Sequence, residues 1–278
     1  MSTAPKEFSL SPDVSIGGSE FFLIAGPCVI ENRQHAKNIA EQLQSLCRKL
    51  GVPFVFKASY DKANRSSLKS YRGPGMDAGL DILAEIKEKY EVPVTSDVHE
   101  PGQVEYAAEV LDIIQIPAFL SRQTDLVMEA ARSGKPVNIK KGQFLSPEDM
   151  KNVLDKALSQ NNSRIILTER GVCFGYNNLV FDVRSVPIMK KWGFPVAVDA
   201  SHSVQRPGGQ GSFSGGDTEF IPFIAGAGIS AGADGIFLEV HDKPESALSD
   251  KYNSLNINNL KDVLQMLIRI RRAVMQTP

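Results

Sequence analysis

The sequence has 278 residues, and its 31 Lys and Arg residues against 32 Asp and Glu residues give a formal net charge of -1 at pH 7. With 42% hydrophobic and 23% charged residues, the composition is typical of a soluble globular protein of one large domain or two ordinary ones. The charges are balanced and scattered along the chain, which argues against a nucleic-acid partner.

The first ten residues carry neither a basic stretch nor a long apolar run, so they do not resemble a secretory signal. Three cysteines, Cys28, Cys47 and Cys173, lie far apart in the sequence. An odd, dispersed set of cysteines fits a reducing compartment and no disulfide framework. We therefore expect a cytoplasmic location.

Short apolar runs alternate with amphipathic segments along the whole chain. The run FFLIAG from Phe21 comes before a segment in which Ile39, Leu43, Leu46 and Leu50 fall on one face of a helix. The following pairs of a predicted strand and a predicted helix are PFVFKAS from Pro53 with Met76–Tyr90, VPVTSDV from Val92 with residues 102–110, and IIQIPA from Ile113 with residues 124–133. The same unit therefore repeats through the first half of the chain.

The second half repeats this pattern. Its predicted strands are PVNIKK from Pro136, RIILTER from Arg164, FPVAVDAS from Phe194 and GIFLEV from Gly235. Its predicted helices are one opened by Ser146 and Pro147, one over residues 183–192, and a last one over about residues 256–274. The most apolar region, residues 220–240, is interrupted by Pro222, four glycines and Asp234, well short of the ~20 apolar residues of a membrane span. We interpret it as a buried helix followed by a buried strand.

About eight such units predict an α/β fold. Strands that are apolar on both faces and alternate with helices indicate a parallel sheet covered on both sides, and this number of units favours closure into a (β/α)₈ TIM barrel. We expect a single domain over residues 1–278, with residues 1–20 as an N-terminal cap or hairpin. A doubly wound open sheet is the alternative.

Basic side chains gather where the predicted strands end, which is the edge where barrel enzymes carry their active sites. The polar residues at these ends are Lys57, Lys62, Asn64, Arg65, Ser66, Ser67, Arg122, Lys140, Lys141, Glu169 and Arg170. Several cations at one barrel mouth would repel one another without an anionic ligand, so they predict a site for phosphate and carboxylate groups. The alternative is a set of ordinary surface charges.

A second group of strand-end residues offers the donor atoms of a metal site: Cys28, His202, Glu239 and Asp250. In a closed barrel the last strand lies beside the first, so these side chains can meet around one ion. Thiolate, imidazole and carboxylates suit a divalent transition ion such as Zn²⁺, Fe²⁺, Mn²⁺ or Co²⁺ better than Mg²⁺ or Ca²⁺. Taken singly, each residue also fits an ordinary packed, hydrogen-bonded or rim position.

Other polar residues near strand ends are less distinctive. Asp97 ends the strand that begins near Val92, and it is the best remaining carboxylate for orienting a hydroxyl, a water or the ion. His99 and His241 also follow strand ends and can support the site, whereas His35 is expected on a solvated helix face.

Two polar loops follow the last two predicted strands, over residues 206–216 and residues 241–255. The first is rich in glycine, and the second carries Asp250. Such loops beside a catalytic mouth predict a lid, the alternative being ordinary surface loops.

Seven longer motifs lie along the chain: KANRSS from Lys62, SYRGPG from Ser70, TSDVHE from Thr95, QIPAFLSRQTDL from Gln115, VNIKKGQF from Val137, ERGVCFGYNNLVFD from Glu169 and DASHSVQRPGG from Asp199. Together they resemble the 3-deoxy-D-manno-octulosonate 8-phosphate synthase family, over nearly the whole chain after its first twenty residues. It implies a transferase that condenses phosphoenolpyruvate with D-arabinose 5-phosphate and releases phosphate, in a homotetramer of (β/α)₈ barrels. The product would be the precursor of the Kdo sugar of lipopolysaccharide or of a plant cell-wall polysaccharide.

The resemblance also implies roles for single residues. Those implied for phosphoenolpyruvate are Lys57, Lys62, Gln115, Ala118, Lys140 and Arg170, and those for arabinose 5-phosphate are Asn64, Arg65 and Ser66, with Ser59 as a further substrate-binding residue. Arg122 would reach into a neighbouring subunit's site, and the implied catalytic residues are Lys62, Asp97, Lys140 and His202. The metal-independent branch of the family carries Asn at the position of Cys28, so the resemblance places this chain in the branch that holds one divalent ion per subunit.

Three other functions stay open from the sequence. The related heptulosonate 7-phosphate synthases use erythrose 4-phosphate, but they carry a Lys-Pro-Arg type motif where this chain has KANRS from Lys62. A Schiff-base aldolase would use Lys57 or Lys140 as its amine. A non-catalytic barrel that only binds a sugar phosphate is the alternative outside the enzymes.

Overall fold

The computed structural model describes residues 6–65, 67–208 and 215–276 of the chain. Eight parallel strands form its centre: β3 (Phe22–Gly26), β4 (Phe54–Lys57), β5 (Val94–Asp97), β6 (Ile113–Ile116), β7 (Val137–Lys140), β8 (Ile165–Glu169), β11 (Val196–Asp199) and β14 (Gly235–His241). They pair in this order, and β14 pairs with both β11 and β3, so the sheet closes on itself. The predicted (β/α)₈ barrel is confirmed, and the open sheet is wrong.

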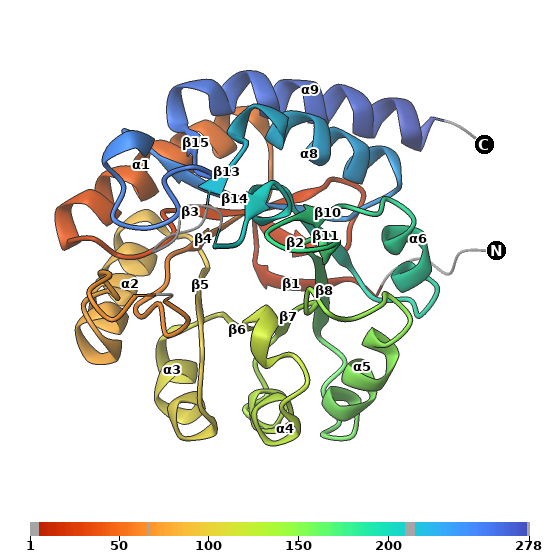
Figure 1. Cartoon of the computed structure of the whole chain (residues 1–278), viewed down its shortest axis with the longest axis horizontal. Coiled ribbons are helices and arrows are strands. Elements are labelled where there is room, and N and C mark those ends of the chain that lie inside the picture. The colour runs from red at the N-terminus through yellow and green to blue at the C-terminus, as the bar shows by residue number, and fades with distance from the viewer. Residues whose placement is uncertain (1–5, 66, 209–214, 277–278) are drawn as a thin grey trace.

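Helices form a ring around the strands (Figure 1). They are α1 (Arg33–Leu50), α2 (Met76–Tyr90), α3 (Val104–Val110), α4 (Thr124–Arg132), α5 (Met150–Leu158), α6 (Ser185–Lys190), α8 (Ile221–Ser230) and α9 (Ile257–Met275). The apolar region 220–240 contains α8 followed by β14, as predicted. Among the described residues, no helix has both the length and the apolar character needed to cross a membrane.

Two apolar layers fix the strands. Alternate side chains of β3 point to opposite sides, so Phe22 and Ile24 pack inside the barrel while Leu23 and Ala25 pack under the helices. The hairpin of β1 (Phe8–Ser11) and β2 (Val14–Ile16) adds Val14 and Ile16 to the inner cluster. The inner cluster also contains Phe22 and Ile113, which are the first residues of β3 and β6. Because Val14 and Ile16 pack in this cluster, the hairpin closes the N-terminal end of the barrel. The opposite end remains available for a site.

Several small elements have no clear signal in the sequence. They are α7 (Ala200–Ser203), the pair β9 (Val172–Cys173) and β10 (Leu179–Val180), the pair β12 (Gln205–Arg206) and β13 (Gly215–Gly216), and β15 (Leu255–Asn256), which pairs in parallel with the end of β14. Most lie in the loops that follow the ends of β8, β11 and β14. These loops are therefore shaped by local pairing as well as by the barrel.

The start of α5 differs from the prediction. The helix begins at Met150 and not directly after Ser146 and Pro147. Ser146 instead exchanges hydrogen bonds with Asp149: its Oγ donates to Oδ2 at 3.0 Å and accepts from the Asp149 N–H at 3.2 Å. This reciprocal pair closes a turn that leads into the helix.

Gly26 controls the contact between β3 and β4. A Cβ added at this position would lie 2.0 Å from the carbonyl oxygen of Lys57. We expect Gly26→Ala to push the two strands apart and to destabilise the protein by about 2 kcal/mol or more, as overpacked cores do. The midpoint of urea denaturation measures this loss.

Gly102→Ala is the matched control, because a Cβ there meets nothing within 4 Å. Its unfolding midpoint should stay close to that of the wild type. Equal midpoints for both variants would show that the close approach of β3 and β4 is not as described.

Candidate active site

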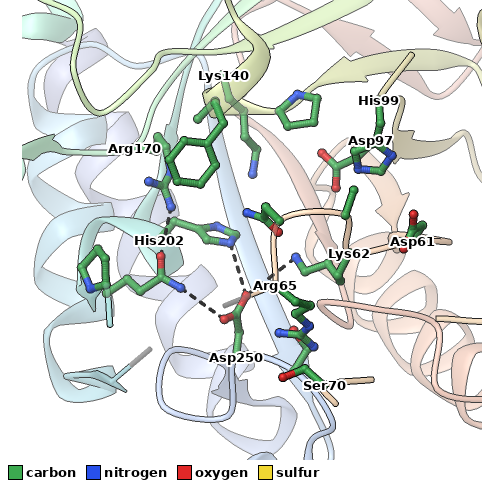
Figure 2. A pocket seen from close by; sticks show the side chains of 18 of the residues that line it. Asp61, Lys62, Arg65, Ser70, Asp97, His99, Lys140, Arg170, His202 and Asp250 are labelled. Carbon is green, nitrogen blue, oxygen red and sulfur yellow. Dashed lines mark hydrogen bonds and ion pairs between the residues drawn. The ribbon is translucent and has the colours of Figure 1, made fainter. Parts of the chain in front are cut away.

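A cavity of about 480 Å³ opens at the C-terminal ends of the barrel strands. The ionisable residues that line it include Lys57, Lys62, Arg65, Asp97, His99, Lys140, Arg170, His202 and Asp250. Figure 2 shows Lys140 and Arg170 on one side of this space and Lys62 and Arg65 on the other, with His202 and Asp250 between them. The predicted cations therefore do converge, and acidic groups lie among them.

A buried carboxylate on β11 holds two of the predicted residues. Asp199 is fully buried, and its Oδ2 accepts a hydrogen bond from the Lys140 Nζ at 2.7 Å. The same carboxylate contacts Nδ1 of His202 at 2.7 Å and accepts the His202 backbone N–H at 2.8 Å. The Lys140 ammonium also lies 3.5 Å from the centroid of the Phe237 ring. Burial lowers the pKa of Lys140, although Asp199 opposes that effect.

Arg170 presents an unused donor at the cavity. Its guanidinium is buried, and Nη2 donates to the Gln205 side chain at 3.2 Å. Nη1 is also buried, and it has no hydrogen-bond partner among the described residues. An unpaired buried donor costs free energy unless a ligand satisfies it. The position is therefore suited to an anion.

Asp97 lies at the end of β5 in a network of donors. Its carboxylate accepts hydrogen bonds from Ser59 Oγ at 2.6 Å and from the Gln115 amide at 2.8 Å, and the Lys57 Nζ lies 3.8 Å away. Burial alone would raise the pKa of Asp97, but Lys57 and Lys140 outweigh it, so the pKa is lowered. Ser59 and Gln115 are fully buried, and their hydrogen bonds hold the Asp97 carboxylate in place.

The four predicted metal ligands meet beside the Lys57 and Lys62 ammonium groups. Cys28, Glu239 and Asp250 each offer a ligand atom, and these three atoms lie within 4.8 Å of one another. Nε2 of His202 lies 3.4 Å from Glu239 Oε1 and 3.7 Å from Asp250 Oδ2. Residues that are more than 200 positions apart in the sequence are thus adjacent because β14 pairs with β3.

This cluster fits a divalent transition ion. Both carboxylate oxygens of Glu239 are buried and have no hydrogen-bond partner among the described residues, with the lysine ammonium groups of Lys57 and Lys62 no closer than 3.6 Å. The Cys28 thiol donates to Asp250 Oδ2 at 3.0 Å, and burial together with the Asp250 and Glu239 charges raises its pKa well above the usual value. A bound cation would satisfy both carboxylates and stabilise the thiolate.

The loop after β4 brings a second set of cations to the rim. The Lys62 Nζ lies 3.7 Å from Asp250 Oδ2. Arg65 donates from Nε to the Tyr71 carbonyl at 2.9 Å and from Nη2 to the Leu248 carbonyl at 3.1 Å. Asn64 is exposed at this rim, and Ser66 lies outside the described residues.

Some predicted residues do not face this cavity. Arg122 is exposed, and its carbonyl accepts a hydrogen bond from Lys156 at 2.8 Å. The Lys141 ammonium is buried, donates to the Leu145 carbonyl at 3.1 Å and lies 3.5 Å from Glu169.

Ala118, by contrast, lines the cavity as predicted. In the predicted loop over residues 206–216, positions 209–214 lie outside the described residues.

The prediction for His35 is wrong. Its side chain is only 13% exposed, and Nε2 contacts the Asp242 carboxylate at 3.1 Å. The helix face that carries it is covered by the loop that follows β14, which the spacing of apolar residues did not reveal.

Comparison with known proteins gives this fold and site a family. The sequence model described as the DAHP synthetase I family matches residues 4–276. A 2-dehydro-3-deoxyphosphooctonate aldolase of Geotalea uraniireducens is 59% identical over 94% of this chain and 96% of its own length. Proteins of the same name from Desulfatibacillum aliphaticivorans and Desulfotalea psychrophila are 56% and 53% identical over 96% and 94% of this chain, and over 98% and 94% of their own lengths.

The chain belongs to the DAHP synthetase I family, with the 2-dehydro-3-deoxyphosphooctonate aldolases. This name is another for 3-deoxy-D-manno-octulosonate 8-phosphate synthase, so the resemblance drawn from the motifs is confirmed.

Two residues of the site carried no predicted role. Asp199 holds Lys140 and His202, and Gln205 joins Arg170 to the Asp250 carboxylate, to which its amide donates at 3.2 Å. Both stand in the DASHSVQ segment, at spacings of three residues on either side of His202. An Asp three residues before the predicted ligand His202 was the available signal for Asp199, whereas the role of Gln205 depends on a contact with the loop after β14.

The lowered pKa of Asp97 predicts how stability depends on pH. The unfolded chain binds a proton at this residue near pH 4, while the folded protein keeps the carboxylate to lower pH, so the stabilisation is present above about pH 4 and is lost as the pH falls towards the folded value. We expect this group to contribute roughly 1–3 kcal/mol to the fall in unfolding free energy on acidification.

Urea denaturation of wild type and Asp97→Asn between pH 6 and pH 3 measures this contribution. The variant should be less stable at pH 6 and should lose less stability on acidification. Parallel pH profiles for the two proteins would contradict the described network around Asp97.

Proposed function

We propose that the protein condenses phosphoenolpyruvate with D-arabinose 5-phosphate and water to give 3-deoxy-D-manno-octulosonate 8-phosphate and inorganic phosphate. The names of relatives at 53–59% identity support this activity. The observation that carries it is the pairing of two unsatisfied groups around one cavity. Arg170 offers a buried donor to an anion, and Glu239 offers two buried oxygens to a cation. The product is the precursor of the lipopolysaccharide sugar Kdo.

Phosphoenolpyruvate would occupy the inner part of the cavity. Arg170 and Lys140 would hold its phosphate, because Nη1 of Arg170 has no hydrogen-bond partner among the described residues and the Lys140 ammonium lines the same wall. Lys57 and Lys62 would hold its carboxylate, because both side chains line the same cavity. Ala118 would border the enol, and Gln115 would act from behind through Asp97.

Arabinose 5-phosphate would enter from the rim. Arg65 and Asn64 line the cavity there, and a planar guanidinium beside a neutral amide can bind a phosphate and a hydroxyl together. Ser66 belongs to the same motif. This placement would direct the aldehyde carbon towards the enol and leave the sugar phosphate near the opening.

The reaction needs two bonds to form and one to break. C3 of the enol bonds to the aldehyde carbon, a water oxygen bonds to C2, and the bond from C2 to the phosphate oxygen breaks. The water gives one proton to the new alkoxide and the other to the departing phosphate as C2 becomes a carbonyl, so charges and atoms balance. Lys57, Lys62, Lys140 and Arg170 hold the anionic groups in register, which is catalysis by positioning. Asp97, held by Ser59, would orient a hydroxyl or the water.

The ligands of the proposed divalent ion would be Cys28, His202, Glu239 and Asp250. Bound there, a Zn²⁺, Fe²⁺, Mn²⁺ or Co²⁺ ion would polarise the aldehyde or activate the water. Asp199 would orient the His202 ring through Nδ1, which leaves Nε2 free as a ligand atom.

We also propose a cytoplasmic homotetramer. Arg122 is exposed and close in sequence to Phe119, an aromatic residue that is 54% exposed at the cavity rim. Large exposed apolar side chains beside a site favour contact with a second copy, whose cavity Arg122 would then reach. Sedimentation velocity tests this state, and a monomer at micromolar concentration would contradict it.

The first test of the activity is phosphate release from phosphoenolpyruvate. Release should require arabinose 5-phosphate and should be far slower with erythrose 4-phosphate, because the loop from Lys62 lacks the Lys-Pro-Arg type motif of the heptulosonate synthases. In Arg65→Ala the KM for arabinose 5-phosphate should rise at least tenfold more than that for phosphoenolpyruvate.

Arg184→Ala serves as a control, since this exposed arginine pairs locally with Asp182 and is not among the residues that line the cavity. A preference for erythrose 4-phosphate would favour the heptulosonate synthases, which share the family model. No release with either aldose would favour a binding barrel. Trapping of a substrate adduct on Lys57 or Lys140 by borohydride would favour a Schiff-base aldolase.

Metal removal is the second test. Exhaustive chelation should abolish turnover, and Mn²⁺, Zn²⁺, Fe²⁺ or Co²⁺ should restore it to different degrees, because the mixed donor set does not select one ion sharply. Cys28→Ser should bind the ion more weakly by at least tenfold, whereas Cys47→Ser, at a packed position on α1, should not. Full activity of the metal-free wild type would refute the metal assignment.

A further inference from the structure

A second group of potential ligands lies outside the active-site cavity, between the loop after β3, the first turn of α1 and the loop after β14. Its members are Glu31, His35 and His241, and each offers a ligand atom such that the three atoms lie within 4.8 Å of one another. The side chains are 14%, 13% and 5% exposed, respectively. Two imidazoles and a carboxylate in a nearly closed site form the ligand set of many zinc centres.

The rings of His35 and His241 lie against each other in a tilted contact. Their centroids are 4.5 Å apart at an interplanar angle of 39°. Nε2 of His241 lies 3.2 Å from Glu31 Oε1. Nδ1 of His35 is buried, and within the described part of the chain it has no hydrogen-bond partner. One ring nitrogen of this cluster therefore lacks the partner that a buried imidazole normally has.

A fourth residue supports both rings from behind. The Oδ1 atom of Asp242 lies 3.1 Å from Nε2 of His35 and 3.0 Å from Nδ1 of His241. Carboxylates that accept the remaining N–H of a metal-ligating histidine are the usual second layer of such sites. The backbone N–H of Lys243 contacts both His241 Nδ1 and Asp242 Oδ1, at 2.9 and 3.0 Å. When Nδ1 of His241 carries a proton, the Lys243 N–H can therefore still donate to Oδ1 of Asp242.

Glu31 is ionised in this environment. Burial opposes ionisation, but hydrogen bonds from His241 and from the Leu248 backbone N–H outweigh it and lower the pKa of Glu31. The carboxylate is thus available to a cation at neutral pH without the loss of a proton.

We propose that Glu31, His35 and His241 form a second divalent-cation site, suited to Zn²⁺ with water as the fourth ligand, that fastens the loop after β14 to the barrel. The proposal does not depend on the condensation activity or on the ion at Cys28. Its consequence for the loop follows from Glu31, which also accepts the Leu248 N–H at 2.8 Å. An ion held by Glu31 would order that residue and, through Leu248, the segment that carries Asp250.

The test is a count of ions in His35→Gln. Gln is favourable at the third position of a helix, so α1, which begins at Arg33, should form normally. The matched control is Gln34→Ala, one residue earlier, whose exposed side chain donates a hydrogen bond to Asn38 and is not a member of the cluster. Chelator-treated proteins are dialysed against Zn²⁺ at micromolar concentration, and bound zinc per subunit is measured.

We expect two zinc ions per subunit in the wild type and in Gln34→Ala, and one in His35→Gln. Titration with Co²⁺ assigns the ions, because only an ion bound to Cys28 gives a sulfur-to-metal absorption band. That band should persist in His35→Gln. The second Co²⁺ ion, which gives no sulfur absorption, should bind at least tenfold more weakly in this variant.

Zinc should also slow tryptic cleavage after Lys251, in the same loop, in a Cys28→Ser background, and the added His35→Gln substitution should remove this protection. The same zinc content and the same cleavage rate with and without His35→Gln would overturn the proposal. A wild type that binds zinc at Cys28 alone would do so as well, and the cluster would then be a hydrogen-bond network only. Loss of the sulfur band with His35-dependent binding retained would count against Cys28 and leave this site standing.

Discussion

Charge buried at the ends of buried strands is the constraint on which the rest of the structure depends. Lys140 and Asp199 illustrate it, since both are almost inaccessible to water and their contact at 2.7 Å compensates the cost of burying each charge. The two apolar layers of the barrel fix the strands, so these groups are held in position before any ligand arrives. Two other buried groups have polar atoms without a hydrogen-bond partner among the described residues: Nη1 of Arg170 and both carboxylate oxygens of Glu239. A site built this way would bind an anion at Arg170 and a cation at Glu239, which would be the physical basis of the proposed condensation.

The loop after β14 connects the parts of the site. Its Leu248 backbone accepts a hydrogen bond from Arg65 and donates one to Glu31, at 3.1 and 2.8 Å. The same loop carries Asp250, which contacts Cys28 and receives the Gln205 amide. Binding of the sugar phosphate at Arg65 would therefore act on the segment that completes the proposed metal site. A cation at Glu31 would act on it from the other side, which makes this loop the natural place where substrate, metal and conformation are coupled.

The fold could be predicted from the sequence because each strand is apolar on both faces and each helix has one apolar face. Met76–Tyr90 has the predicted bounds of α2, and the apolar region 220–240 divides into α8 and β14 as expected. The convergence of Cys28, His202, Glu239 and Asp250 also followed, since closure places the last strand beside the first. Contacts made by loops did not follow. Asp242 covers His35, and Gln205 reaches Asp250, through segments whose path depends on tertiary packing. The turn at Ser146 shows the same limit on a smaller scale, because a capping pair can close a turn before a helix begins.

A crystal structure of the complex with phosphoenolpyruvate and Zn²⁺, with anomalous scattering recorded at the zinc edge, tests the central claim most directly. The account predicts an anomalous peak bound by Cys28 Sγ at about 2.3 Å, with Nε2 of His202 and the carboxylates of Glu239 and Asp250 completing the ligands. It also predicts the phosphate of phosphoenolpyruvate within hydrogen-bond distance of Arg170 Nη1. A complex in which Cys28 remains an unligated thiol, or in which phosphoenolpyruvate binds away from Arg170, would contradict it.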